Sequence, residues 1–132
     1  MKVKIETTMT DYDSFVESRK RILEICQNIM DMKQPEYTNG DPDILHNFKS
    51  IAKIMQVPTE QIWATYFFKH VQAIMSHASQ PDLEPAEPLQ SRFADAINYL
   101  FLGYALLCEH NRFKKNHFIE NEASLSDIYR NE

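Results

Sequence analysis

The stretch that decides the fold is 89–110, with the sequence LQSRFADAINYLFLGYALLCEH. Apolar side chains recur so densely here that they cover nearly the whole circumference of the helix that this stretch predicts. A helix that is apolar all round lies in a core or in an oligomer interface, so it needs partners. The sequence therefore predicts a last long helix, roughly from Pro88 to His110, around which the other elements are arranged.

An earlier long helix is predicted near the start of the chain. Ser14 and Glu17 have the spacing of a capping box, so this helix is expected to begin near Asp13 or Ser14. Apolar residues then recur at helical spacing up to Met30. Pro35 is expected to end the helix, because proline lacks the N–H donor that a helix interior needs.

Two more helices are expected between these. Asp41 can cap the second helix, with Pro42 at its first position, and the helix ends near Val57. The third helix begins at Pro58 and carries a broad apolar stripe. Residues 80–88 contain three prolines and are expected to link the third and fourth helices rather than to separate domains.

These elements predict an all-α fold, a compact bundle of four main helices in a single domain over 1–132. Its core covers about 13–110, and a polar tail follows over 111–132. Residues 2–6 alternate polar and apolar side chains, which fits one short N-terminal strand. The chain offers no partner strand, so this segment either lacks structure or pairs across a dimer.

Composition excludes several classes of protein. The 132 residues carry 19 acidic and 14 basic side chains, a net charge of −5, so a nucleic-acid partner is not expected. No apolar run reaches the roughly 18 residues of a membrane span, and no signal peptide is recognisable. We therefore expect a cytoplasmic protein that does not enter a membrane. Both cysteines, Cys26 and Cys108, are expected to be buried free thiols.

The last helix contains one chemical anomaly. Asp95 and Asn98 are three residues apart in a very apolar context, and Arg92 precedes Asp95 by three. A buried charge must be paired or bound to a metal. One interpretation is a structural ion pair in which Arg92 or Lys69 neutralises Asp95. The other is a ligand site in which the Asp95 carboxylate binds Mg²⁺, since oxygen ligands suit this ion.

Two further groups of polar residues are candidates for ligand binding. Lys69 and His70 lie in the third helix and offer donors for anionic oxygens, although a lone histidine on an apolar stripe is often structural. His46 and Asn47 are expected on one helix face, where they either contact a base or sugar or are simply solvated. Tyr37, in the expected loop before them, is placed to stack on a base.

The order of several short motifs resembles the phage-enriched nucleotide modification associated family. These motifs are Lys33-x-x-x-Tyr37 with Gly40-Asp41, then Asn47-Phe48-x-x-Ile51-Ala52, a helical Lys69, and Asp95-x-x-x-Tyr99. The likeness spans roughly residues 33–108. It implies a protein of nucleotide metabolism that acts in the cytoplasm of a phage-infected host.

The last helix also resembles the second metal helix of MazG-like all-α nucleotide pyrophosphohydrolases. Asp95 matches the final Asp of their Glu-x-x-Asp motif, whereas Arg92 stands where that family has Glu. The resemblance implies a Mg²⁺-dependent homodimer in which Asp95 holds the metal, and Lys69 and Arg92 offset charge on the phosphates. The replaced carboxylate favours nucleotide binding over hydrolysis.

Three functions are therefore compatible with the sequence. The leading hypothesis is a protein that binds a (deoxy)nucleoside phosphate and, if it is an enzyme, hydrolyses it with Asp95 and Lys69 as catalytic residues. The second is a non-catalytic interaction protein that inhibits a host protein through exposed aromatic side chains. The third is a nucleotide sponge that uses the same pocket without turnover.

Overall fold

The computed structural model describes residues 9–111 and 129–130. Four helices make up most of this part of the chain: α1 (Tyr12–Thr38), α2 (His46–Met55), α3 (Thr59–Ser79) and α4 (Leu89–Asn111). No strand occurs among the described residues, so the all-α prediction is confirmed. The strand expected at 2–6 and most of the polar tail lie outside them.

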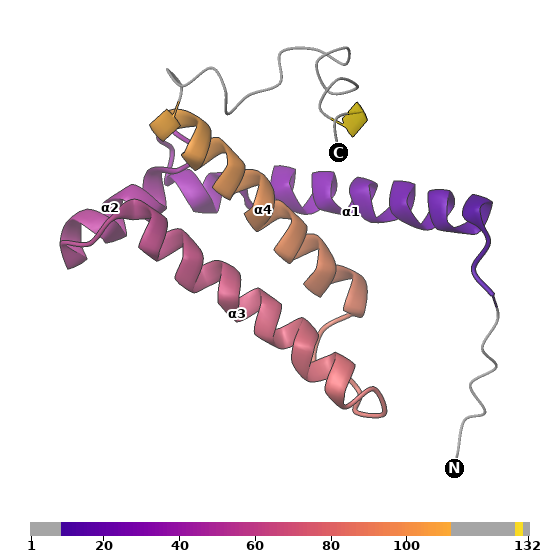
Figure 1. Ribbon diagram of the computed structural model, residues 1–132. Coiled ribbons are helices and arrows are strands. Elements are labelled where there is room, and N and C mark those ends of the chain that lie inside the picture. Colours follow the sequence, from indigo (N-terminus) through magenta and orange to yellow (C-terminus); the bar gives the residue numbers. More distant parts are fainter. Residues whose placement is uncertain (1–8, 112–128, 131–132) are drawn as a thin grey trace.

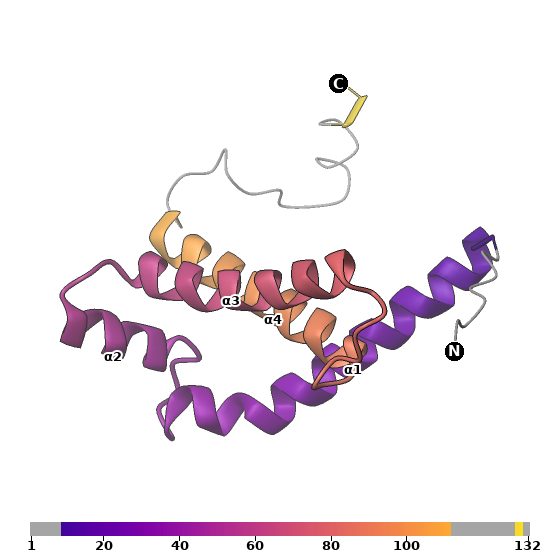
Figure 2. The same ribbon diagram turned by 90° about the horizontal axis from the view of Figure 1, so that it is seen from below.

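The helices form two layers. Helices α3 and α4 run antiparallel and side by side, and α1 crosses behind α4 (Figures 1 and 2). Helix α2 contacts both α1 and α3 and closes one end of the bundle. The N-terminal part of α1 projects beyond the other helices, which Figure 2 shows clearly. None of the helices in the described residues combines the length and apolar character of a membrane span.

The core lies where α2, α3 and α4 meet. The inward face of α4 supplies three of its buried side chains, and α2 with its preceding turn supplies another three. Its members are Leu45, Phe48, Ala52, Ile62, Tyr99, Leu102 and Leu106. Helix α1 joins α4 at a separate crossing, where the buried thiol of Cys26 lies against Ala94. The second thiol, Cys108, is only half-buried.

The contact between α3 and α4 depends on one glycine. Gly103 faces Trp63, and a Cβ atom at position 103 would overlap the indole ring. The same indole donates a hydrogen bond of 2.7 Å from Nε1 to the carbonyl oxygen of Tyr99. A bulky residue on α3 can therefore lie directly against the backbone of α4.

Helix α1 departs from the prediction at both ends. Asp11, not Asp13 or Ser14, caps the helix, since its Oδ1 accepts a hydrogen bond of 2.8 Å from the Ser14 amide. The predicted end at Pro35 is wrong, because the helix continues to Thr38. Proline removes only its own N–H, and the Pro35 carbonyl still accepts from the amide of Asn39.

The turn before α2 also differs from the prediction. Asp41 was expected to cap a helix that starts at Pro42, but α2 begins at His46. Asp41 instead accepts from the Asp43 amide, and Asp43 from the Leu45 amide, each at 2.9 Å. These short side-chain-to-backbone bonds favour a turn over a helix. The predicted limits of α3 and α4 agree with the structure to within a residue or two.

We expect Gly103→Ala to destabilise the protein by about 1–3 kcal/mol through overpacking against Trp63. On an open helix surface the same change would stabilise by up to about 1 kcal/mol, so the sign of the effect is informative. Urea denaturation followed by circular dichroism measures it. Combining the change with Trp63→Leu should restore part of the loss. A stabilised single variant would show that α3 and α4 lie farther apart.

Candidate functional site

The charged residue that the sequence singled out is buried beside a lysine of another helix. Asp95 is 8% exposed, and its Oδ1 lies 3.4 Å from Nζ of Lys33, near the end of α1. Among the described residues this ion pair, rather than one with Arg92 or Lys69, neutralises the carboxylate. The continuation of α1 through Pro35 keeps Lys33 in regular helix at this position.

Aromatic rings surround the next turn of α4. Tyr99, four residues after Asp95, is buried, and its ring centroid lies 4.6 Å from that of His70. The rings of Tyr37, Phe48 and Tyr66 have centroids 5.9–6.4 Å from it. The ion pair therefore sits at the edge of an aromatic cluster that α1, α2 and α3 build around one tyrosine.

Burial shifts the pKa of three groups in this cluster, Tyr37, Tyr99 and His70, toward the uncharged form. Removal from water raises the pKa of the Tyr37 and Tyr99 phenols, and the nearby charge of Asp95 raises both further. Burial lowers the pKa of the His70 imidazole, an effect that Asp95 opposes and that Lys69 and Lys33 reinforce. At neutral pH the Tyr37 and Tyr99 phenols and the His70 imidazole are therefore uncharged beside the ion pair.

A hollow of about 330 Å³ lies further along the α3–α4 seam. Arg92, one helical turn before Asp95, lines it together with Ser76, His77 and Gln80 from the end of α3 and Glu84 from the linker. Four of these five side chains offer hydrogen-bond donors or can do so. The ion pair between α1 and α4 and the donor-rich hollow between α3 and α4 therefore lie about one helical turn apart along α4.

The remaining predicted site residues lie elsewhere. Lys69 is exposed on α3. Nδ2 of Asn98 donates to the carbonyl oxygen of Cys26 at 3.0 Å, and Nδ2 of Asn47 donates to that of Glu36 at 2.5 Å. These two amides fix α1 against α4 and α2. His46 lies at the start of α2, with its Nδ1 3.5 Å from a carboxylate oxygen of Asp41.

The structure thus brings together Tyr37, His70 and Asp95 from the predicted set, and it adds Lys33 and Tyr99. A signal for these two was present in the sequence. Lys33 and Tyr37 are four residues apart, as are Asp95 and Tyr99, so each pair shares a helix face. Because the sequence predicts that the first helix ends at Pro35, Lys33 and Tyr37 were not expected to share a helix face.

The binding of Mg²⁺ by Asp95 stays a prediction. The Lys33 ammonium already faces the carboxylate, and no group of three His, Cys, Asp or Glu side chains in the described ranges could hold a metal ion. Mg²⁺ takes one or two protein carboxylates together with waters and substrate phosphates, so Asp95 would have to exchange its lysine for the metal.

No protein-family description, curated protein or solved structure matches this chain. A function must therefore be argued from the chemistry of the site itself.

We expect Lys33→Met to destabilise the protein by about 1–3 kcal/mol, because it leaves the buried Asp95 carboxylate without a partner. Asp95→Asn should cost less, since the Lys33 side chain is 38% exposed and can be solvated. The double variant should be more stable than Lys33→Met alone. Urea titrations of all four proteins measure the coupling, with Lys53→Met on the exposed face of α2 as control. Additive losses would contradict an interaction between the two charges.

His70 should make the protein less stable in mild acid. Its pKa is lowered in the folded state, so the unfolded chain binds the proton more readily. The stability is then complete above the ordinary pKa of 6.5 and decreases as the pH falls below it. His70→Gln should reduce this decrease in urea titrations between about pH 7 and pH 5. His110→Gln, at a side chain that is 67% exposed, serves as control. Parallel pH profiles for wild type and His70→Gln would contradict the assignment.

Proposed function

We propose that this chain binds a nucleoside phosphate along the seam between α3 and α4, beside the end of α1. The observation that carries the proposal is the ion pair of Lys33 and Asp95, which lies at the edge of an aromatic cluster and one helical turn of α4 from the donor-rich hollow that Arg92 lines. Aromatic faces stack on a base, cations bind phosphates, and a carboxylate accepts hydrogen bonds from a sugar.

Two cations are placed to meet the phosphates. The Lys33 ammonium has three donors, of which Asp95 uses one, and its side chain is 38% exposed. Arg92 supplies a planar fork that matches phosphate oxygens in the adjacent hollow. Asp95 is paired with Lys33 and Glu84 lines the hollow with Arg92, so the two cations would act on the phosphates through direct hydrogen bonds and not through a local excess of positive charge.

The aromatic cluster supplies a surface for the base. Tyr66 is 38% exposed and Tyr37 is half-buried, so both have ring area that a ligand can reach. Stacking a base on an aromatic side chain contributes about 1–3 kcal/mol. The Asp95 carboxylate, held by Lys33, can accept a hydrogen bond from a sugar hydroxyl or a base amino group.

The proposal is binding rather than hydrolysis. The carboxylate that would hold a metal is paired with an ammonium group, and Lys69, the second predicted catalytic residue, is exposed on α3. A sponge or sensor for nucleotides needs only affinity, which the cations and rings supply. This supports the non-catalytic member of the nucleotide hypotheses.

A screen of nucleoside mono-, di- and triphosphates by thermal shift, with and without Mg²⁺, tests the proposal. A bound nucleotide at a hundredfold excess over Kd should raise stability by about 2.7 kcal/mol. Lys33→Met and Arg92→Gln should each weaken binding by about tenfold, as expected for the loss of roughly 1.4 kcal/mol. The matched control Lys53→Met removes an exposed lysine of α2 and should leave the affinity unchanged.

The outcomes separate the functions that the sequence left open. A shift without release of phosphate or pyrophosphate supports binding alone. Turnover that requires Mg²⁺ would show that the carboxylate of Asp95 exchanges its lysine for a metal. The absence of a shift with every nucleotide would overturn the proposal and leave an interaction protein as the remaining hypothesis.

A further inference from the structure

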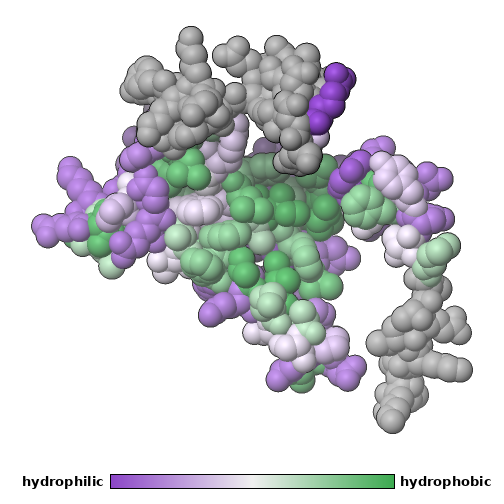
Figure 3. All heavy atoms as spheres, in the orientation of Figure 1, coloured by the Kyte–Doolittle hydropathy of each residue, from purple (hydrophilic) through white to green (hydrophobic). Residues whose placement is uncertain are grey.

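We infer that two copies of this chain associate through the outer face of α4, packing their α4 helices antiparallel about a two-fold axis. The outer face is the stripe formed by Phe93, Ile97, Leu100, Phe101, Tyr104 and Leu107. In the part of the chain that the structure describes, five of these six side chains are 42–65% exposed, although the sequence of α4 is apolar all round. Figure 3 shows the apolar surface gathered over α4.

The exposed apolar area is large for a protein of this size. Phe93 is 42% exposed, Leu100 and Phe101 are each 52% exposed, and Tyr104 is 65% exposed. With Phe15 at 49%, the four exposed aromatic side chains alone present on the order of 400 Å² of surface. That is half of the roughly 800 Å² that each partner buries in a stable complex. Leu100, Leu107 and the side chains around them extend it further.

The outer face is uncharged along its whole length. Between Phe93 and Cys108 the one charged residue of α4 is Asp95, which points inward to Lys33. Pairing two such helix faces therefore buries no charged side chain of α4. A partner protein chosen by complementary charge would find nothing on this face to recognise, whereas a second copy offers an equally apolar one.

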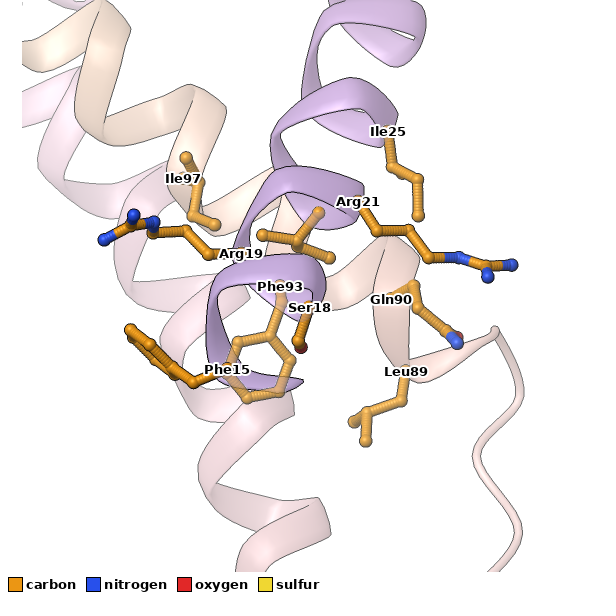
Figure 4. Close-up of a pocket in the computed structure, with 10 residues that line it drawn as sticks. Phe15, Ser18, Arg19, Arg21, Ile25, Leu89, Gln90, Phe93 and Ile97 are labelled. Carbon is orange, nitrogen blue, oxygen red and sulfur yellow. The ribbon is translucent and has the colours of Figure 1, made fainter. Parts of the chain in front are cut away.

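The two ends of the face have complementary shapes. At the N-terminal end, α1 and α4 enclose a hollow of about 540 Å³ between Phe15 and Ile22 on one side and Phe93 and Ile97 on the other. Figure 4 shows Phe15 and Phe93 at this hollow, with the guanidinium groups of Arg19 and Arg21 pointing to opposite sides of α1.

At the C-terminal end, Tyr104 and Leu107 project from the surface and are 65% and 48% exposed. An antiparallel pair places these side chains of each copy over the hollow of the other. Each copy then fills the hollow of the other, and no hollow is left to bind a third copy. The assembly therefore closes as a dimer instead of growing into a filament. Leu100, midway between Phe93 and Leu107, then lies at the two-fold axis and meets Leu100 of the second copy.

Sedimentation equilibrium of the full chain at micromolar concentration tests the association. We expect a mass twice the 15.5 kDa of one chain. Leu100→Glu should yield a monomer with unchanged helical circular dichroism, because position 100 is half exposed within one copy. The control Ile54→Glu, at an 81% exposed position on α2, should remain dimeric. A wild-type monomer at about 100 μM would overturn the inference, and so would a dimer that Leu100→Glu does not weaken.

Cross-linking provides a second test that does not depend on the glutamate variant folding. In a Cys108→Ser background, Leu100→Cys treated with oxidised glutathione should form a disulfide-linked dimer rapidly. Ile54→Cys in the same background should link at least tenfold more slowly. Equal rates at the two positions would contradict the central place of Leu100. Neither experiment involves Lys33 or Arg92, so its result is independent of nucleotide binding.

Discussion

A carboxylate can lie in the interior of this small protein because an ammonium group reaches it from another helix. Asp95 faces inward from α4, and Lys33 approaches from the last turns of α1. An unpaired charge at that position would cost about 1–3 kcal/mol, so the pair links the packing of α1 to that of α4. The hydrogen bond from Asn98 to the Cys26 carbonyl fixes the same crossing three residues further along α4. The orientation of α1 is thereby set by polar contacts, while α3 and α4 are held mainly by apolar ones.

Helix α4 accordingly has two faces of different chemical character. Its inner face carries the ion pair and the ring of Tyr99, and it leads to the donor-rich hollow near Arg92. Its outer face carries no charged side chain, and the described residues leave most of it exposed. A ligand of the inner face and a partner of the outer face would approach from different directions, so one helix can serve both without competition between them.

Most of the fold was predictable from the sequence, because proline positions and apolar periodicity mark the limits of α3 and α4 closely. The predicted helix limits are wrong at Pro35 and at Asp41, where the chain satisfies its backbone hydrogen bonds in a way other than the expected one. Pro35 does not end α1, since a helix tolerates one missing donor near its C-terminus, and Asp41 and Asp43 form a turn instead of a cap. The buried position of Asp95 followed from its neighbours, but the identity of its partner did not. Lys33 is 62 residues away in sequence, and only the crossing of α1 and α4 brings the two together.

The close approach at Gly103 has a practical consequence for spectroscopy. The chain contains a single tryptophan, Trp63, whose indole N–H is bonded to the Tyr99 carbonyl and whose ring is stacked on Phe67 at 5.3 Å. All tryptophan emission therefore arises from the seam between α3 and α4, one turn from the aromatic cluster. The natural protein thus contains its own fluorophore at the place where separation of these two helices, or occupation of the seam, would change the polarity around the indole.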